Sequence, residues 1–438
     1  MIRIPCAAVL AASALLLGAC SQELILEGER IALRAPFGDA RPSVPENRAV
    51  PISLPAPAAL SEWTHRLATP GGSPGHVALA AAPERVWSAN IGQGESRRHR
   101  ITADPIVAGG RVFALDSQAT VTAVNAATGA IAWQRDLTPA FGRRGNASGG
   151  GLAFGGGRLF VTTAFGQIMA LDPETGAEIW SFRFDAPATA APSVIGDRVY
   201  VVAADSSGWA FDTLTGRIAW QLPAMPSPAS MVGGARPAAA GGLVVLPYPS
   251  GEVAGVRPSD GTRAWSSRVA GSRPGQAYAG VRDITGDPVV VGNTVYVASQ
   301  SGRIAAFDAQ SGLTRWNGRE GAYSPVWPVG GSLFLISDIG ELVRLDAASG
   351  DRIWGVALPY YTRDRERRRA EVHAHYGPVV AGGRVIVLSN DGLMRSFDPV
   401  SGAQVSELAL PRPAASNPAV VNGVLYFVST DGQLHALR

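Results

Sequence analysis

A nine-residue phrase recurs seven times along this sequence and constrains its fold more than any other feature. Most copies open on aspartate or asparagine, and all place glycine at the fifth position; six end in tryptophan, whereas the seventh ends in Ser406. A spacing of roughly 40 to 50 residues is typical of repeat architectures in which each repeat forms one structural unit. The copies are residues 125–133, 172–180, 212–220, 257–265, 308–316, 346–354 and 398–406.

Each phrase is expected to form a tight turn between two β-strands. The opening Asp or Asn can accept backbone N–H bonds, and the glycine supplies the left-handed backbone conformation that such turns need. Short β-rich runs separated by glycine precede the phrase, as in residues 377–388 and 393–397. Each repeat therefore predicts three strands before the turn and a fourth after it, which is the signature of a propeller blade.

The two ends of the repeat region set the number of blades. Residues 418–437 hold three further strands without a fourth, whereas residues 86–89 form a strand-like segment without a blade of its own. Joining them completes an eighth blade. We therefore expect an all-β, eight-bladed β-propeller over residues 84–438, closed by its N-terminal strand, which removes exposed sheet edges. A seven-bladed ring is the alternative, and it would leave Trp87 unused.

Seven tryptophans stand at one fixed offset from these turns. One such residue per blade favours a structural role, in which each indole packs between neighbouring blades, over a shared aromatic cofactor site. These docking tryptophans are Trp87, Trp133, Trp180, Trp220, Trp265, Trp316 and Trp354.

Composition excludes several kinds of chemistry. Both cysteines, Cys6 and Cys20, lie near the start, so the rest of the chain has no disulfide, thiolate metal ligand or cysteine nucleophile. All 38 basic residues are arginine, and with 35 acidic residues they leave a net charge of only +3 over 438 residues. We therefore expect no nucleic-acid partner.

The first 19 residues have the pattern of a secretory signal peptide. A short positive region precedes an apolar run too short to span a bilayer, and small residues lead to Cys20. This end resembles a bacterial lipobox, which implies cleavage before Cys20, acylation of that cysteine and, with Ser21 following, sorting to the outer membrane. An ordinary signal peptide with a coincidental cysteine is the alternative.

Residues 20–83 are rich in proline and alanine and lack sustained periodicity. Because prolines fix backbone angles and extend a chain, we expect a tether between the lipid anchor and the propeller. Parts of this segment, including residues 49–52 and Glu62-Trp63, are expected to pack on the propeller.

The sequence offers no catalytic or metal-binding pattern. His373 and His375 alternate without an acidic residue spaced as a third metal ligand. The glycine-rich run 145–151 lacks the lysine and the following helix of a phosphate-binding loop. The mixed-charge run Arg363 to Arg369 is expected to be a solvated insertion, with contact to anionic lipid, peptidoglycan or an acidic partner as the alternative.

The repeated phrase resembles the tryptophan-docking motif shared by quinoprotein dehydrogenases and by the BamB family, lipoproteins of the outer-membrane β-barrel assembly (BAM) machinery. Both families have eight-bladed propellers. Quinoprotein dehydrogenases hold pyrroloquinoline quinone over calcium and commonly carry a vicinal disulfide, whereas this propeller has no cysteine pair and no long insertions. With the lipobox and tether, the resemblance to the BamB family implies a non-enzymatic scaffold without a cofactor, anchored in the outer membrane and facing the periplasm.

The same resemblance implies where a partner binds. In the BamB family two neighbouring long connections, here residues 223–236 and 269–287, bind a periplasmic POTRA domain of BamA. One arginine and one aspartate of the family's motifs are replaced here, by Val232 and Thr285. Arg236 or Arg282 is expected to compensate, or the contact to be rebuilt around Met231 and Tyr278. The expected contact residues are Ala229, Ser230, Met231, Val232, Arg236, Arg282, Asp283 and Thr285.

The function expected from this resemblance is docking on BamA, beside other BAM components, and assistance to unfolded β-barrel precursors on their way into the outer membrane. Two alternatives remain. One is a periplasmic dehydrogenase-like protein that depends on pyrroloquinoline quinone, and the other is a lipid-anchored propeller that binds peptidoglycan or another envelope partner.

Overall fold

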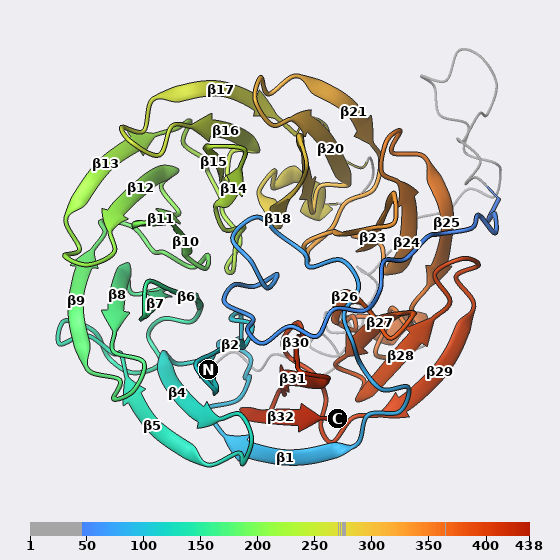
Figure 1. The fold of residues 1–438 in the computed structure, drawn as a ribbon, viewed down its shortest axis with the longest axis horizontal. Coiled ribbons are helices and arrows are strands. Elements are labelled where there is room, and N and C mark those ends of the chain that lie inside the picture. The colour runs from blue at the N-terminus through green and yellow to red at the C-terminus, as the bar shows by residue number, and fades with distance from the viewer. Residues whose placement is uncertain (1–45, 270, 272, 274–276, 364) are drawn as a thin grey trace, which may run out of the picture. The chain divides into compact units, whose positions relative to one another are not determined.

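The computed structural model describes residues 46–438, apart from residues 270, 272, 274–276 and 364. Its 32 strands form eight four-stranded antiparallel sheets arranged as the blades of a ring (Figure 1). The predicted eight-bladed β-propeller is thereby confirmed. The described part contains two short 3-10 helices, η1 (Ala277–Gly280) and η2 (Glu366–Arg368). Neither these nor any other helix described has the length and hydropathy needed to cross a membrane.

Each of the first seven blades uses four consecutive strands, which run from the inner strand at the channel to the outer strand at the rim (Figure 1). Blades one to four comprise β2 (Ile106–Ala108), β3 (Arg111–Leu115), β4 (Thr120–Asn125) and β5 (Ile131–Asp136); β6 (Gly150–Gly155), β7 (Arg158–Thr163), β8 (Gln167–Leu171) and β9 (Glu178–Arg183); β10 (Ser193–Ile195), β11 (Arg198–Val202), β12 (Ser207–Asp212) and β13 (Ile218–Pro223); β14 (Ala238–Ala240), β15 (Leu243–Pro247), β16 (Glu252–Val256) and β17 (Arg263–Arg268). Blades five to seven comprise β18 (Ile284–Val291), β19 (Thr294–Ser299), β20 (Arg303–Asp308) and β21 (Thr314–Gly318); β22 (Trp327–Val329), β23 (Ser332–Ile336), β24 (Glu341–Asp346) and β25 (Arg352–Ala357); β26 (His375–Ala381), β27 (Arg384–Ser389), β28 (Leu393–Phe397) and β29 (Gln404–Ala409).

The eighth blade joins the two ends of the ring. Its outer strand β1 (Arg85–Asn90) pairs antiparallel with β32 (Gln433–Leu437), which follows β30 (Ala419–Val421) and β31 (Val424–Val428). Glu84 and Arg438 exchange two backbone hydrogen bonds, of 2.7 and 2.8 Å, next to this pair. The N-terminal strand therefore closes the ring as the sequence predicts.

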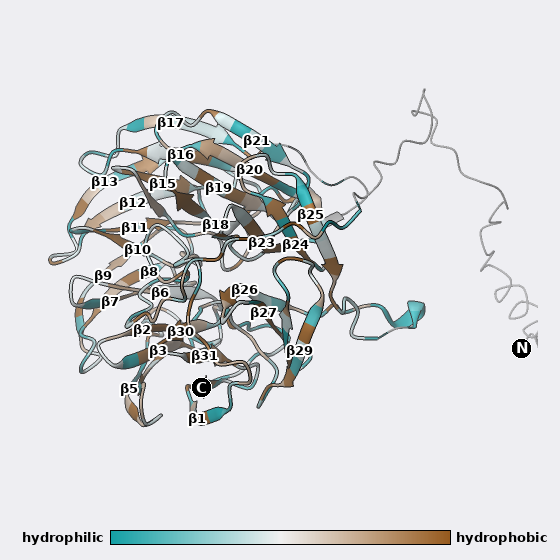
Figure 2. Cartoon of the chain, turned by 45° about the vertical axis from the view of Figure 1, so that its right-hand side comes forward, coloured by the Kyte–Doolittle hydropathy of each residue, from teal (hydrophilic) through white to brown (hydrophobic). Residues whose placement is uncertain are grey.

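Burial follows the place of a strand within its blade. The middle strands β3 and β8 are buried at nearly every residue, whereas the outer strands β5 and β9 alternate exposed and partly buried residues. Figure 2 shows the same gradient, with brown middle strands and more teal in the outer strands and turns. Sheets packed face to face bury both faces of their central strands, so the core lies between neighbouring blades.

The docking tryptophans all make the same contact with the next blade. Each indole N–H donates to the carbonyl of the second residue in the phrase of the next blade, over 2.9–3.2 Å. Trp87 in blade eight makes this bond to the phrase of blade one, where the propeller closes. The glycine of each phrase lies against the indole ring of the tryptophan. At Gly176, where φ is 72°, an added Cβ atom would come within 2.7 Å of the Trp133 indole. Glycine is needed both for the turn and for the approach of the indole.

Residues 60–77, which we call the hub segment, run through the middle of the ring (blue in Figure 1). Backbone or side-chain hydrogen bonds join this segment to every one of the eight blades, at an inner strand or at the residue that follows it. The partners in blades one to eight are Val107, Phe154, Val194, Ala239, Val290, Trp327, Val380 and Asn422.

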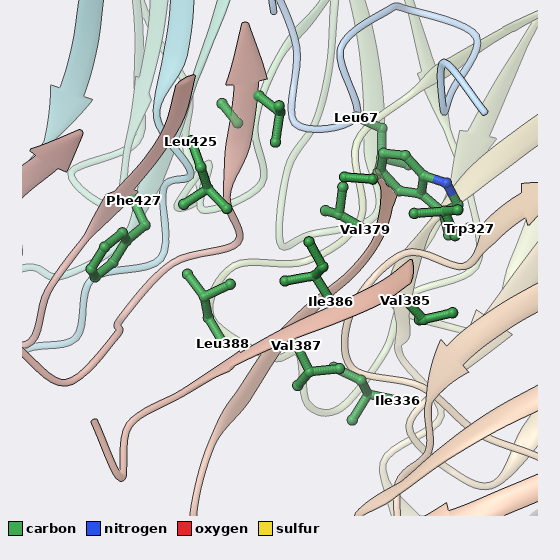
Figure 3. Packing of buried hydrophobic residues seen from close by; sticks show 14 of the residues in the cluster. Leu67, Trp327, Ile336, Val379, Val385, Ile386, Val387, Leu388, Leu425 and Phe427 are labelled. Atoms are coloured by element: carbon green, nitrogen blue, oxygen red, sulfur yellow. The ribbon is translucent and has the colours of Figure 1, made fainter. Parts of the chain in front are cut away.

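The hub segment also belongs to the largest hydrophobic core. Trp63 is 1% exposed and stacks on Trp327 with ring centroids 6.2 Å apart, and Leu67 packs in the same cluster as Val379 and Ile386 (Figure 3). Within the segment expected to be a tether, the described residues 46–83 thus pack on the ring, and residues 60–77 occupy its centre.

Candidate partner-binding face

A central cavity of about 440 Å³ lies where the connections between blades gather. Most of its lining comes from the connections that lead from one blade's outer strand to the next blade's inner strand. The hub residue Arg66, the ends of β18 and β26, and the turn between β23 and β24 complete it. Four tyrosines border the cavity: Tyr278, Tyr323, Tyr360 and Tyr376.

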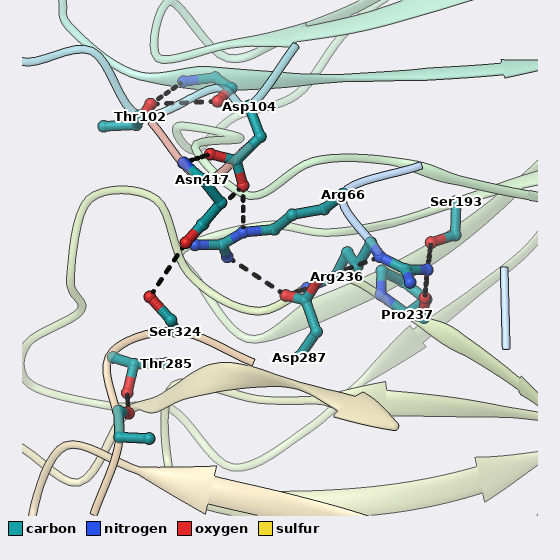
Figure 4. A network of polar contacts seen from close by, with 12 residues as sticks. Arg66, Thr102, Asp104, Ser193, Arg236, Pro237, Thr285, Asp287, Ser324 and Asn417 are labelled. Atoms are coloured by element: carbon teal, nitrogen blue, oxygen red, sulfur yellow. Dashed lines mark hydrogen bonds and ion pairs between the residues drawn. The ribbon is translucent and has the colours of Figure 1, made fainter. Parts of the chain in front are cut away.

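A buried polar network around Arg66 ties the hub segment to the cavity wall (Figure 4). The Arg66 guanidinium pairs with Asp104 at 2.8 Å and with Asp287 at 3.3 Å. Asn417 donates its backbone and side-chain N–H groups to Asp104, at 2.7 and 2.8 Å. Burial raises the pKa of Asp104, which Arg66 and Asn417 oppose.

The two connections expected to bind a partner contact each other. The backbone N–H of Met231, between β13 and β14, donates to a carboxylate oxygen of Asp283 at 2.6 Å, just before β18. Asp283 is 3% exposed, and burial raises its pKa to about 6 although the N–H groups of Met231 and Ile284 oppose that shift. The carboxylate therefore holds the first connection in place.

Three apolar side chains of the first connection remain open to solvent. The exposed fraction is 54% for Met225, 36% for Met231 and 56% for Val232. Met231 and Val232 border the central cavity. Ala229, Ser230 and Arg282 are exposed beside them. We call Met225, Met231 and Val232 the apolar edge; of the expected contact residues, a partner can reach Met231 and Val232 of this edge together with Ala229, Ser230 and Arg282.

Three of the expected contact residues lie inside the protein. The Arg236 side chain is fully buried, pairs with Asp287 at 3.0 Å and donates to the carbonyls of Thr69 and Pro70 in the hub segment. Thr285 is buried and donates its hydroxyl to the carbonyl of Ala322 at 2.6 Å. Asp283 is the third. The structure thus differs from the expectation that Arg236, Asp283 and Thr285 face a partner, because the three side chains are buried and bond to the hub segment, to Met231 and to Ala322.

Tyr278, expected at the contact, lies on η1 at the cavity and donates its hydroxyl to Asp338 at 3.1 Å. Arg273 forms a two-pronged ion pair with the same carboxylate, with both distances 2.8 Å. These bonds fix the second connection to blade six rather than leaving its polar groups free.

The paired histidines also line the cavity and already have partners. His375 contacts the Ser389 hydroxyl through Nδ1 at 2.6 Å and the Pro359 carbonyl through Nε2 at 2.8 Å, and burial lowers its pKa. His373 contacts Asn390 at 3.1 Å. Among residues 46–438 as described, no group of three His, Cys, Asp or Glu side chains could hold a metal ion.

This chemistry does not fit a quinone held over calcium. The carboxylates of Asp104 and Asp338 at the cavity are each paired with an arginine, which removes the free oxygen ligands that calcium prefers. The cavity is bordered by four tyrosines and by charged groups that are already paired, and Met231 and Val232 of the apolar edge lie at its side.

Sequence reasoning missed Arg66, Asp104 and Asn417, which line the cavity, and Asp287, which pairs with Arg66. Only Asp287 left a signal, as a second acid four residues after Asp283. The described residues of the charged run, Arg363 and residues 365–369, are exposed in the connection that includes η2. Cys20 and the expected signal peptide lie outside the described residues.

Comparison with known proteins points to one family. The family model described as outer membrane protein assembly factor BamB matches residues 117–356 and 363–438. Outer membrane protein assembly factor BamB of Shewanella oneidensis is 24% identical over 364 residues, which cover 80% of this chain and 88% of that protein. The Escherichia coli protein of the same name is 22% identical over 360 residues, with 81% and 88% covered.

Solved structures agree on the fold. The crystal structure of BamB from Moraxella catarrhalis superposes with a TM-score of 0.66 at 22% identity and covers 81% of this chain and 99% of that one. Quinohemoprotein alcohol dehydrogenase from Comamonas testosteroni gives a TM-score of 0.64 at 14% identity, with 87% and 81% covered. The second match reflects the shared propeller, because a fold alone does not determine activity.

Proposed function

Since this chain belongs to the outer membrane protein assembly factor BamB family, we propose that it is a non-catalytic scaffold that docks on a POTRA domain of BamA and assists β-barrel precursors into the outer membrane. The observation that carries the docking site is the apolar edge. Met225, Met231 and Val232 are each exposed on the connection between β13 and β14, and the Met231 backbone N–H is held by Asp283 at 2.6 Å. A rigid loop that presents exposed apolar side chains loses little conformational freedom on binding.

The contact proposed here is more apolar than charged. Arg236 is committed to Asp287 and to the hub segment, so it offers no charge to a partner. Arg282 is exposed beside the apolar edge and supplies the cation at the rim. An apolar centre with a polar rim is the usual anatomy of a protein interface.

The proposal includes an anchor and a compartment. Acylation of Cys20 would hold the propeller at the outer membrane on its periplasmic side, because several acyl chains on one residue bind a bilayer durably. Fractionation of cells that produce the full chain tests this part. Wild-type protein is expected with the outer membrane, and Cys20→Ala is expected in the soluble periplasmic fraction or unprocessed; an unchanged distribution contradicts the anchor.

The docking site is tested by co-purification with BamA from detergent-solubilised outer membranes. We expect the double variant Met231→Glu, Val232→Glu to lose BamA, because carboxylates would then be desolvated in an apolar contact. Asp283 is left unchanged, because its burial makes it a folding residue rather than a surface one. Leu313→Glu is the matched control, since Leu313 is 70% exposed in a turn of blade five and does not border the cavity.

A further inference from the structure

The connection between blades six and seven projects from the ring as an arm. Its base is paired in the manner of a β-hairpin: Tyr361 forms an antiparallel β-bridge with Val372, and Thr362 donates its backbone N–H to the Glu371 carbonyl at 3.1 Å. The 3-10 helix η2 lies beyond this base, and Figure 2 shows it in teal, projecting away from the blades. The paired base holds the two sides of the arm together where it leaves the ring.

The far part of the arm carries four arginines that are open to solvent. We call them the arginine tip: Arg363, Arg365, Arg367 and Arg368. Among the residues that the structure describes, no carboxylate pairs with any of these four side chains. Residues 363–369 hold five arginines and two acidic residues, so the net charge of this run, +3, equals the net charge of the whole chain. The positive excess of the protein is therefore concentrated on the arm.

The first described residues lie beside the strand that leads into the arm. Asn47 exchanges two hydrogen bonds with the backbone of Gly355, at 2.9 and 3.0 Å, and the Arg48 N–H donates to the Ile353 carbonyl at 2.9 Å. Figure 1 shows this segment in dark blue next to β25. Because residue numbers fall along one chain as they rise along the other, the step from Arg48 to Asn47 points toward the end of β25, where the arm begins.

This geometry relates the arm to the proposed lipid anchor. Cys20 precedes the first described residue, Glu46, by 26 residues. A chain of that length spans at most roughly 90 Å when it is fully extended. The tether therefore joins the ring on the side of the arm, and a membrane that holds Cys20 lies within its reach.

We propose that the arginine tip binds anionic phospholipid headgroups of the membrane that holds Cys20, an inference that rests on the anchor proposed above. Guanidinium groups bind phosphate oxygens through paired N–H donors, and each basic residue near an anionic bilayer adds to the attraction. A lipid chain and a basic patch together give a more durable attachment than either alone. Tyr361, 39% exposed at the base of the arm, adds an aromatic ring of the kind found at membrane interfaces.

The proposed contact also orients the ring. The arm follows β25, whereas the apolar edge lies between β13 and β14, on the other side of the ring in Figure 1. A membrane bound by the arginine tip holds the side of blades six and seven and leaves the apolar edge open to BamA.

The experiment measures co-sedimentation of the full chain with lipid vesicles, in a Cys20→Ala background so that acylation plays no part. One set of vesicles holds equal parts of phosphatidylcholine and phosphatidylglycerol, and the other holds phosphatidylcholine alone. We expect this parent protein to prefer the anionic vesicles and to lose that preference in high salt. Arg367→Gln, Arg368→Gln is expected to weaken binding to the anionic vesicles by about tenfold or more.

The matched control is Arg217→Gln, Arg257→Gln, which removes the same charge from exposed positions in the turns of blades three and four. It is expected to bind like the parent protein. Residues 1–45 are identical in all variants, so any lipid contact that they make cancels in the comparison.

A second variant, Arg363→Gln, Arg365→Gln, keeps the test decisive if the first does not fold. Equal binding by the parent and a folded tip variant, or no preference of the parent for anionic vesicles, would overturn the proposal. Loss of BamA from a tip variant that still binds vesicles would overturn it too, because an acidic protein would then be the occupant.

Two other measurements separate this proposal from those made above. Fractionation of cells with and without Cys20→Ala tests the anchor, and co-purification tests docking on BamA, which the tip variants are expected to retain. An unchanged distribution, or no BamA with the wild type, contradicts the proposed function whatever the vesicles show. If the anchor and the docking both hold and the tip variants bind vesicles like the parent, only the proposal for the arm fails.

Discussion

The backbone N–H of Met231 lies 2.6 Å from a carboxylate oxygen of Asp283, so a buried acid of one connection fixes the exposed apolar edge of its neighbour. This link explains how a loop without regular structure between β13 and β14 can present Met231 and Val232 in a fixed place. It also makes the loop sensitive to the protonation of one group, because burial raises the pKa of Asp283 to about 6.

The raised pKa of Asp283 predicts a pH dependence of stability. Between about pH 4 and 6 the folded state holds this proton more tightly than the unfolded state, so stability falls as pH rises through that window and is constant above it. Asp283→Asn removes the titration and keeps an acceptor for Met231. We expect the free energy of unfolding of the wild type, relative to this variant, to fall by on the order of 2 kcal/mol between pH 4 and 7.

Denaturant titrations of the two proteins at both pH values measure that difference directly. A gap between wild type and Asp283→Asn that does not change with pH would contradict the assignment of this shift to Asp283.

Tryptophan docking predicts a graded loss of stability at Trp265. This side chain is 6% exposed and donates to the Ala309 carbonyl at 3.0 Å. Trp265→Ala should cost about 3–5 kcal/mol through the cavity it leaves. Trp265→Phe should cost less, because part of the packing remains. Urea unfolding followed by circular dichroism gives both values, and a cost below about 1 kcal/mol for the alanine variant would argue against docking as the bond between blades.

The receiving glycine should be equally sensitive. Gly312 has φ of 68°, and a Cβ atom there would lie 2.5 Å from the Trp265 ring. Gly312→Ala should therefore destabilise the protein by more than about 1 kcal/mol, through backbone strain and displacement of the indole. Gly292→Ala is the control for strain alone, since its φ is 57° and no atom lies within 4 Å of its Cβ position. Equal losses for the two variants would contradict the proposed packing.

The buried ion pairs of Asp287 predict a large effect of one neutral substitution. Asp287→Asn removes the carboxylate that pairs with both Arg236 and Arg66 and leaves a buried positive charge uncompensated. We expect it to lower the free energy of unfolding by about 3–5 kcal/mol. Glu178→Gln, which removes the partner of Arg135 from an exposed pair at 3.3 Å, should cost less than about 1 kcal/mol. Thermal unfolding of both variants tests the contrast, and similar losses would contradict a structural role for the Arg236–Asp287 pair.

The fold could be predicted from the sequence because its information is local. Each phrase carries its own turn glycine and its own tryptophan, so one repeat indicates a blade and the two unmatched ends indicate closure. The phrase without tryptophan, ending at Ser406, was visible as well. Why this phrase has no tryptophan can be seen only in the structure. Arg438 donates its backbone N–H to Glu84 as the first residue of other phrases does to the sixth, so Pro83 stands where those phrases have the glycine that receives an indole.

The hub segment and the cavity could not be predicted in the same way. Residues 60–77 lack periodicity because they bond to eight different blades in turn, most of them distant in the sequence. The sequence does not distinguish Arg236 from Arg282, yet Arg236 is buried and pairs with Asp287, whereas Arg282 is exposed. Which arginine is buried and which is exposed depends on the hub segment, and no local pattern encodes that.

The most direct test of the account is capture of BamA by the tagged full chain from solubilised outer membranes. Wild type and Leu313→Glu should retain BamA, and the Met231→Glu, Val232→Glu variant should lose it while its circular dichroism spectrum stays that of the folded ring. BamA missing from the wild-type sample, or present in equal amounts with the folded double variant, would contradict docking through the apolar edge.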